Sequence, residues 1–516
     1  MDFEIFPSYI WMFPDTSNGK HEINISTARN SCACCQMFLY ALPNSVITWS
    51  FESTELSAPE LFEILPVTVN KNSCFLEELD TERTSAEDME KYYTKKAPFI
   101  VYDALKPAGE HFICKNEKTP LYLKWHISKE MPPGSYSGCV KFSSESADIS
   151  VPVRITISKA VIPDNKQFKM INWIEPNPVH YEYTPFSPKH WEVLKKLNRL
   201  ACDAHQTHIN LNASFFYYKG TADNPEFCFE RAKTYINLCM EQGCKYIEGP
   251  NLKTIYLNMY PNADEGSFGS DNCFAFLKAF IEQWYAFLKA SELDGITVQH
   301  IFDEPRSKNI HIYKKLGKLV KEIMPDVPTI DAVLTTDLDS NPDIVIPTTR
   351  FYQLHRDEFN KMISDSDKRR LWLYTCCWPS APYLNRFLDM PLLSVRYIHW
   401  LCFKLNVSAY LHWGFCFQAD VQDSYTEPSI PFKIFDDSLE QYLPPGDTNI
   451  VYPYNGEPIG SVRLEMQRAG IEDFELLSSL SRSRAEELTG KCITDDFTAD
   501  FSPELFDEVY NELLDC

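Results

Sequence analysis

The 516-residue chain lacks the features by which several common classes of protein are identified. Basic residues are few, 49 against 72 acidic ones, which gives a formal net charge of −23, and Lys and Arg form no extended run. An acidic surface repels nucleic-acid phosphates, so we expect no nucleic-acid partner. No Gly-rich loop of the GxGxxG or GxxxxGK type follows any strand-like segment, so the sequence does not support nucleotide binding.

Signals for export and for membrane insertion are also missing. The N-terminal segment has no basic start followed by an apolar run, and no stretch of about 18 apolar residues occurs. We therefore predict a cytoplasmic protein with no membrane partner.

Paired metal-binding cysteine motifs are absent as well. The 17 cysteines are odd in number and scattered along the chain. The tightest group, Cys32, Cys34 and Cys35, lacks the paired CxxC spacing of a zinc site, and Cys376 and Cys377 lie inside an apolar segment. We predict reduced structural thiols, with no metal and no organic cofactor.

The residues that are abundant indicate a folded protein of more than one domain. Apolar residues make up 44% and aromatic residues 14%, which excludes a disordered chain. Residues 1–160 contain short alternating runs, for example 45–51, 120–127 and 148–157, separated by Pro, Asn, Ser and Gly turns. This pattern predicts an N-terminal β-sandwich.

Residues 161–516 show a different pattern, in which strand-like pieces alternate with segments of helical periodicity. The helical segments are 188–202, 229–243, 271–293, 310–323, 357–364 and 391–405. About seven or eight strand–helix repeats are typical of a (β/α)8 barrel, so we predict a TIM-like barrel as the catalytic domain. A doubly wound open sheet is the alternative.

A last helix is predicted over residues 458–480 as one of the C-terminal helices of the barrel domain. It places Arg463, Glu465 and Arg468 on one polar face, and we expect surface ion pairs there.

The segment Ile296–Pro305 (ITVQHIFDEP) is the strongest candidate for a site of chemistry. It alternates like a strand and ends in two carboxylates and a proline, which places Asp303 and Glu304 at the C-terminal end of a strand. Catalytic groups of a barrel collect at that end, and two adjacent carboxylates repel, so one of them should hold its proton near neutral pH. A solvated turn before the next helix is the alternative, because the Asp-Glu pair also occurs at 264–265, 357–358 and 507–508.

Further polar and aromatic residues lie at the ends of other predicted strands. They are Trp173, Glu175, Asn210, Asn212, Glu248, Tyr374, Trp378, His412 and Trp413. Acids handle protons, amides bind hydroxyls and indoles lie against the C–H face of a ring, so together these residues indicate a sugar site. Taken singly, a tryptophan at a strand end is more often a packing residue than a surface that binds a sugar ring.

Three segments of the chain resemble glycoside hydrolase family 123 and its relatives. They are Leu371–Trp400, Ala409–Phe415 (AYLHWGF) and Gly446–Leu477, which begins GDTNIVYPYNGEPIG. The turn Pro133–Gly138 (PGSYSG) is similar to the last hairpin of the N-terminal sandwich in that family. The resemblance covers most of the chain and agrees with the predicted barrel.

This resemblance implies an exo-acting β-N-acetylgalactosaminidase that retains configuration by substrate assistance. The 2-acetamido oxygen of the sugar attacks C1 to give an oxazolinium ion, so no enzyme nucleophile is needed. Glu304 would act as the acid and then the base, and Asp303 would accept the acetamido N–H. We predict that Tyr374 holds the acetamido oxygen, and that Trp378 and Trp413 form the apolar wall.

The predicted substrate is therefore an oligosaccharide or glycoconjugate that ends in a β-linked 2-acetamido sugar. One alternative is a glycosidase for another sugar, in which Glu175 or Glu248 is the nucleophile. The other is a non-catalytic carbohydrate-binding protein that has kept the fold.

Overall fold

The computed structural model describes residues 1–73, 90, 92–431, 442–494 and 497–516. They form two compact units. Unit 1 comprises Met1–Phe168, Ser380–Asn406 and Gln418–Cys516, and unit 2 comprises Lys169–Pro379 and Val407–Phe417. The predicted domains, residues 1–160 and 161–516, follow the chain and remain a prediction, whereas the two units interleave along it.

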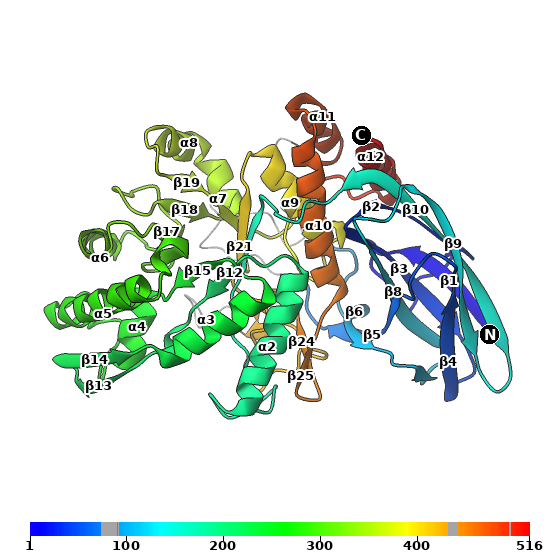
Figure 1. The fold of residues 1–516 in the computed structure, drawn as a ribbon, viewed down its shortest axis with the longest axis horizontal. Coiled ribbons are helices and arrows are strands. Elements are labelled where there is room, and N and C mark those ends of the chain that lie inside the picture. Colours follow the sequence, from blue (N-terminus) through cyan, green and yellow to red (C-terminus); the bar gives the residue numbers. More distant parts are fainter. Residues whose placement is uncertain (74–89, 91, 432–441, 495–496) are drawn as a thin grey trace. The chain divides into compact units, whose positions relative to one another are not determined.

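Two five-stranded sheets form the N-terminal part of unit 1, as Figure 1 shows. The first sheet is antiparallel and has the order β1-β3-β8-β5-β6. The second has the order β2-β10-β9-β4-β7, in which β2 and β10 run parallel. The strands are β1 (Asp2–Pro7), β2 (Ile23–Arg29), β3 (Ser31–Tyr40), β4 (Ser45–Glu52), β5 (Glu60–Val69), β6 (Phe99–Pro107), β7 (His111–Cys114), β8 (Lys118–Ile127), β9 (Gly134–Ser143) and β10 (Asp148–Val161). The sheet-rich N-terminal region is thus confirmed.

Side chains from both sheets share one apolar core. Ala33, Cys35 and Met37 of β3 point into it, and they meet Phe142 and Val151 of the other sheet. This alternate burial follows from the two-residue period of a strand, which is the pattern that predicts these strands in the sequence.

Unit 1 is completed by α9 (Leu393–Lys404), α10 (Val462–Ser479), α11 (Arg482–Cys492), α12 (Pro503–Asp515), and the short hairpins β22–β23 (Ile430–Pro431, Tyr442–Leu443) and β24–β25 (Tyr452–Tyr454, Glu457–Ile459). Helix α10 lies within the predicted helix 458–480, but the expected surface ion pairs are wrong. Arg463 is fully buried and its Nε donates to Asp103 Oδ2 at 2.8 Å. Arg468 is also buried, between Glu465 and Glu472. The polar face is inside because α10 packs against α9 and β6, and the charges are paired there.

Unit 2 contains parallel strands in two sheets. The first sheet has the order β11-β21-β20 and the second β12-β15-β16-β17-β18-β19. The strands are β11 (Lys169–Asn172), β12 (His208–Asn210), β15 (Tyr246–Gly249), β16 (Thr297–His300), β17 (Thr329–Val333), β18 (Ile344–Pro347), β19 (Arg370–Leu371), β20 (Leu373–Tyr374) and β21 (Ala409–His412). The two sheets meet at two places: Thr207 N, just before the edge strand β12, donates to Met170 O of β11 at 3.0 Å, and Thr348, which follows β18, forms a parallel bridge with Tyr374 of β20.

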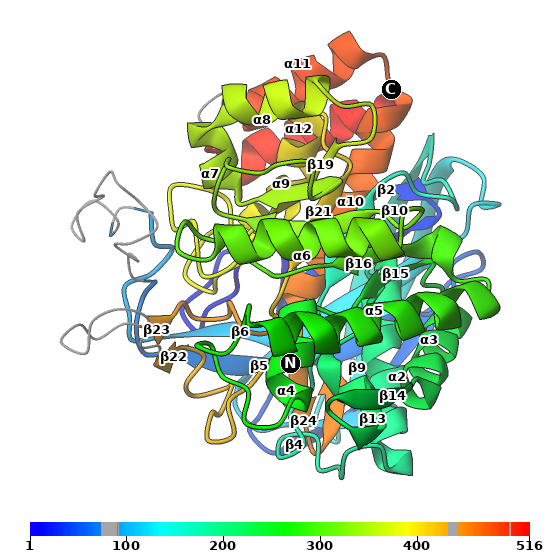
Figure 2. The same cartoon turned by 90° about the vertical axis from the view of Figure 1, so that its left-hand side faces the viewer.

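Helices lie between most of these strands along the described chain, but none lies between β17 and β18 or between β19 and β20. Helices α5 and α6 lie side by side in Figure 2. The helices and short 3-10 turns are α2 (Pro188–Asp203), η1 (Ala213–Phe215), α3 (Glu230–Gln242), α4 (Leu252–Met259), α5 (Asp271–Ala290), η2 (Asp294–Ile296), α6 (Ile310–Ile323), α7 (Thr349–Leu354) and α8 (Arg356–Ser364). Ser187, Ser270 and Thr348 accept hydrogen bonds that cap α2, α5 and α7. The chain is therefore a mixed α/β protein.

The hairpin β13–β14 (Tyr217–Thr221, Asn224–Cys228) and helix α4 were not predicted from the sequence. Both are short inserts with a weak repeat of apolar residues. No helix in the described ranges is long and apolar enough to cross a lipid bilayer.

Candidate active site

Asp303 and Glu304 follow β16, an inner strand of the six-stranded sheet. Both have left-handed backbone conformations, with φ of 76° at Asp303 and 48° at Glu304. In a regular strand, successive side chains point to opposite faces, so a straight strand would separate the two carboxyls. The left-handed turn ends that alternation at a cost of about 1–2 kcal/mol per residue. Such strained backbone persists only where the surroundings hold it.

Hydrogen bonds from the neighbouring strand β17 hold this turn. The carboxylate of Asp331 accepts the backbone N–H of Asp303 at 2.6 Å and that of Phe302 at 3.2 Å. The next residue, Ala332, accepts the backbone N–H of Glu304 at 2.9 Å. Hydrogen bonds to a charged acceptor contribute about 1.5–3 kcal/mol each, which is enough to offset the cost of the turn.

The two adjacent carboxyls do not ionise independently. Burial and the neighbouring Glu304 carboxylate raise the pKa of Asp303 from 3.8 to about 7, while the charge of His300 acts in the opposite direction. Two carboxyls that interact so strongly titrate as a pair. The pair therefore retains one proton up to about neutral pH.

A buried network of charges lies beside the pair. His300 Nδ1 is 3.3 Å from Glu248 Oε1, and His300 Nε2 is 3.4 Å from Asp331 Oδ1. Burial alone would lower the pKa of His300, but Asp331 and Glu248 raise it well above 6.5, so the imidazole is charged. Glu248 Oε2 also accepts from Trp173 Nε1 at 3.0 Å and from Asn210 Nδ2 at 3.1 Å. Glu248 is thus fixed by two hydrogen bonds to Oε2 and by the charge of His300 beside Oε1.

Tyr374 reaches the pair from β20. Its hydroxyl donates to Glu304 Oε1 at 2.5 Å, and burial together with this acceptor raises the pKa of Tyr374 well above 10. The other oxygen of Glu304, Oε2, lies 3.9 Å from the guanidinium of Arg306. Because the Glu304 side chain is 30% exposed, a ligand can reach its carboxyl.

The remaining predicted residues occupy several environments. Trp413 is half-buried, as is Trp173, whereas Trp378 is only 2% exposed. His412 is buried, and its Nδ1 accepts from Gly414 N at 3.1 Å. Asn212 caps the short η1 turn by accepting from Ser214 N at 3.1 Å. The geometry therefore connects Tyr374, Glu248 and Trp173 to the pair by hydrogen bonds and close charges, and the substrate-binding roles of all seven residues stay predictions.

Sequence reasoning missed two residues of this site, His300 and Asp331. Both lie in strands that read as apolar, TVQH and TIDAV, and both are buried. A charged residue inside an apolar strand was the available signal, because such a residue is buried only when it has a partner.

Comparison with known proteins assigns the chain to a family. The model of the glycoside hydrolase 123 catalytic domain matches residues 173–480, the span that contains the carboxylate pair and the charges around it. The chain belongs to glycoside hydrolase family 123. It is accordingly a glycoside hydrolase, and the resemblance seen in the sequence is confirmed.

One solved structure supports the fold of this family 123 hydrolase. A family 123 glycoside hydrolase from Clostridium perfringens is similar over 99% of the chain and 96% of its own, with a TM-score of 0.73 and 14% identity. A family 39 glycoside hydrolase from Bacteroides cellulosilyticus gives a TM-score of 0.39 at 12% identity, over 88% of this chain and 82% of that one. No curated protein sequence matches the chain.

Proposed function

We propose that this glycoside hydrolase removes a terminal β-linked 2-acetamido sugar, GalNAc in the first instance, by a retaining, substrate-assisted mechanism. The observation that carries the proposal is the left-handed Asp303–Glu304 pair with its shared proton. The Clostridium perfringens enzyme of this family is described for the hydrolysis of glycolipid glycans, and a glycoconjugate is a suitable substrate for the present protein too.

In the proposed reaction, Asp303 first fixes the acetamido group. Its carboxylate accepts the acetamido N–H, which turns the carbonyl oxygen towards C1 and stabilises the positive charge that develops on the group. Binding of this donor favours the ionised form of Asp303. In this proposal Glu304 is then the member of the pair that supplies the catalytic proton.

Glu304 then carries the proton. It protonates the glycosidic oxygen as the C1–O bond breaks and the acetamido oxygen bonds to C1, which gives the oxazolinium ion. In the second half of the reaction the Glu304 carboxylate takes a proton from water as that water attacks C1. The sugar leaves with its original β configuration, and Glu304 regains its proton.

Tyr374 takes a supporting role in this proposal. Its hydroxyl donates to Glu304 Oε1 in the free enzyme. When the acetamido carbonyl enters, the same hydroxyl can donate to that oxygen, which releases Glu304 for proton transfer. The half-buried indoles of Trp173 and Trp413 are the better placed candidates for the apolar wall, since Trp378 has little exposed surface.

We also propose that the two sheets of unit 2 close into a distorted (β/α)8 barrel. Strands β11, β17, β18, β20 and β21 from both sheets contribute to one apolar core, which includes Ile171, Ile330, Ile346, Tyr374 and Leu411. A common core enclosed by parallel strands is what a barrel of eight strands requires. The bridge between Thr348, which follows β18, and Tyr374 of β20 connects the two sheets.

The test is release of p-nitrophenol from β-GalNAc, β-GlcNAc and β-galactose glycosides. We expect turnover of an acetamido sugar and none of galactose. Glu304→Gln should lower hydrolysis of natural linkages by about two to four powers of ten, and less for the activated aryl glycoside. The matched control is Glu358→Gln in the exposed Asp357–Glu358 pair of α8, which should keep wild-type activity. If Glu304→Gln lowers the rate of hydrolysis equally for natural and activated substrates, the assignment of Glu304 as the acid is refuted.

A second glycosidase mechanism rests on Glu175, which lines a cavity of about 440 Å³ in unit 2 together with Asn212 and aromatic side chains. There Glu175 would attack C1 directly, on a sugar without an acetamido group. Glu248 is unsuited to that role, because hydrogen bonds and His300 engage both of its oxygens. A thiazoline analogue of the oxazoline separates the two mechanisms: strong inhibition supports substrate assistance, and absence of inhibition supports Glu175.

A further inference from the structure

Unit 1 contains a second cluster of reactive side chains, whose chemistry differs from that of the carboxylate pair in unit 2. Cys32, His126 and Glu60 lie on the neighbouring strands β3, β8 and β5 of the first sheet. Cys32 is directly opposite His126 in the strand register, and Glu60 is opposite Lys124. Because Cys32 alternates with core residues Ala33 and Cys35, its side chain is on the outer face of the sheet.

The three side chains are connected in series. The Sγ of Cys32 is 3.5 Å from His126 Nδ1, and His126 Nε2 makes a short contact with Glu60 Oε1. The hydrogen bonds to Cys32 and Glu60 raise the pKa of His126 to about 10, and the hydrogen bond from His126 lowers that of Glu60. A thiol, an imidazole and a carboxylate in this order are the parts of an activated sulfur nucleophile.

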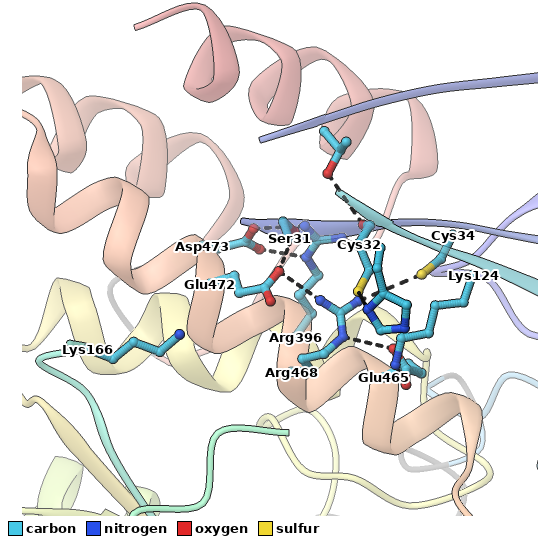
Figure 3. A network of polar contacts seen from close by, with 12 residues as sticks. Ser31, Cys32, Cys34, Lys124, Lys166, Arg396, Glu465, Arg468, Glu472 and Asp473 are labelled. Carbon is cyan, nitrogen blue, oxygen red and sulfur yellow. Dashed lines mark hydrogen bonds and ion pairs between the residues drawn. The ribbon is translucent and has the colours of Figure 1, made fainter. Parts of the chain in front are cut away.

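Two cationic side chains, Lys124 and Arg468, lie near Cys32 and Cys34, as Figure 3 shows, and each is also paired with an acidic side chain of α10. Lys124 Nζ is 2.7 Å from Glu465 Oε1, and Arg468 Nη2 is 3.7 Å from Cys34 Sγ. Burial lowers the pKa of Arg468, but the charges of Cys32, Glu472 and Glu465 raise it well above its usual value. A positive surrounding stabilises a thiolate, which is the reactive form of cysteine.

A cavity of about 290 Å³ in unit 1 opens beside this cluster. Cys32, Cys34 and Tyr122 line it, together with apolar side chains such as Phe6 and Phe506. Tyr122 is fully buried, and its hydroxyl has no hydrogen-bond partner of ordinary geometry within the described residues. A buried polar group that lines a cavity without a partner indicates a place where a ligand atom binds. The imidazole and the carboxylate stay exposed at 61% and 50%, so reagents have access from solvent.

We propose that Cys32 is a nucleophilic cysteine whose thiol is activated by His126 and Glu60, and that it forms a mixed disulfide with small disulfide compounds that enter this cavity. The Cys32 thiol gives its proton to water while the protonated imidazole of His126 stabilises the sulfur anion, and that sulfur bonds to one sulfur of the compound. The sulfur–sulfur bond of the compound breaks, and the departing thiolate takes up a proton from water. The protein is oxidised to the mixed disulfide and the compound is reduced to a free thiol, so electrons balance without another reagent.

The experiment treats the full-length protein with dithiodipyridine at pH 7, follows release of thiopyridone, and maps the modified cysteines by peptide mass. Cys139 is the internal control, because it is also half-buried in a strand and the contact found for its sulfur is the Val140 carbonyl. We expect Cys32 to react at least about tenfold faster than Cys139. Equal rates at the two cysteines would overturn the proposal.

Two substitutions identify the cause of the reactivity. His126→Gln should slow the reaction of Cys32 towards the rate of Cys139, whereas His111→Gln on the exposed strand β7 should leave it unchanged. His126 is exposed, so its replacement leaves the core intact. A Cys32 rate that is the same in wild type and His126→Gln would also overturn the proposal.

Discussion

The raised pKa of Asp303 means that the folded enzyme is destabilised when this carboxyl is ionised. The cost can be measured as a change in the free energy of unfolding. The pKa is raised from 3.8 to about 7, a difference of about 3 units, and each unit corresponds to about 1.36 kcal/mol. The full penalty for ionised Asp303 is thus about 4 kcal/mol. Partial exposure screens the repulsion, so we expect Asp303→Asn to raise the free energy of unfolding by about 2 kcal/mol at pH 8. Asparagine adopts the left-handed conformation readily, so the backbone turn is kept.

The sign of this effect depends on pH. Below about pH 4 the carboxyl is protonated in both folded and unfolded chains, and the wild type loses no stability there. As pH rises towards 7 the unfolded chain releases the proton and the folded chain keeps it, so wild-type stability falls and the advantage of Asp303→Asn grows. Above about pH 7 the advantage is constant.

Urea unfolding followed by tryptophan fluorescence at pH 4 and pH 8 measures this difference. The control is Asp357→Asn in the exposed Asp-Glu pair of α8, which should show no gain that grows with pH. A gain for Asp303→Asn that is the same at both pH values, or no gain at pH 8, would refute the reasoning. Activity should be lost in Asp303→Asn on natural and activated substrates alike, because charge forms on the acetamido group with either.

Three further outcomes follow from the same geometry. The kcat/KM for a β-GalNAc aryl glycoside should fall about tenfold per pH unit above about pH 7, because the pair then loses its shared proton; a flat profile to pH 9 would contradict this. Tyr374→Phe removes the hydrogen bond to Glu304 and should lower kcat by about 10- to 100-fold without unfolding the protein, as steady-state kinetics and circular dichroism would show. Asp331→Asn should destabilise the protein by about 2–4 kcal/mol in urea unfolding, because it weakens two backbone hydrogen bonds and the pairing of His300; unchanged stability would contradict its role as an anchor.

The sequence predicts those features that depend on local pattern. Helix α6 has the predicted bounds, 310–323, and α2 ends one residue beyond the predicted 202, because the apolar period of both helices and the Ser187 cap of α2 are local features. The position of Asp303 and Glu304 after a strand is local in the same sense.

Features that depend on distant partners were beyond the sequence. The polar face of α10 reads as solvent-exposed, yet Arg463 is buried against Asp103, which is 360 residues away in the chain. His300 and Asp331 likewise have the pattern of strand residues, and only the parallel pairing of β15, β16 and β17 brings His300 between Glu248 and Asp331. The period of apolar residues along a strand does not predict that pairing. It shows which face of the sheet a residue occupies, but not which residue lies opposite on the neighbouring strand.

Asp331 connects the fold of unit 2 to the chemistry proposed for the pair. Two adjacent carboxyls act on one substrate only if their side chains reach the same space, and a regular strand points them apart. The left-handed turn at Asp303 and Glu304 removes that obstacle, and the Asp331 carboxylate holds the turn by accepting the N–H of Phe302 and of Asp303. The same carboxylate also pairs with His300, whose positive charge opposes a further rise in the pKa of Asp303. One side chain on the neighbouring strand thus holds the geometry of the pair and also contributes, after burial, Glu304 and His300, to the proton affinity of Asp303, so the proposed use of neighbouring residues as acid and stabiliser depends on the carboxylate at that position.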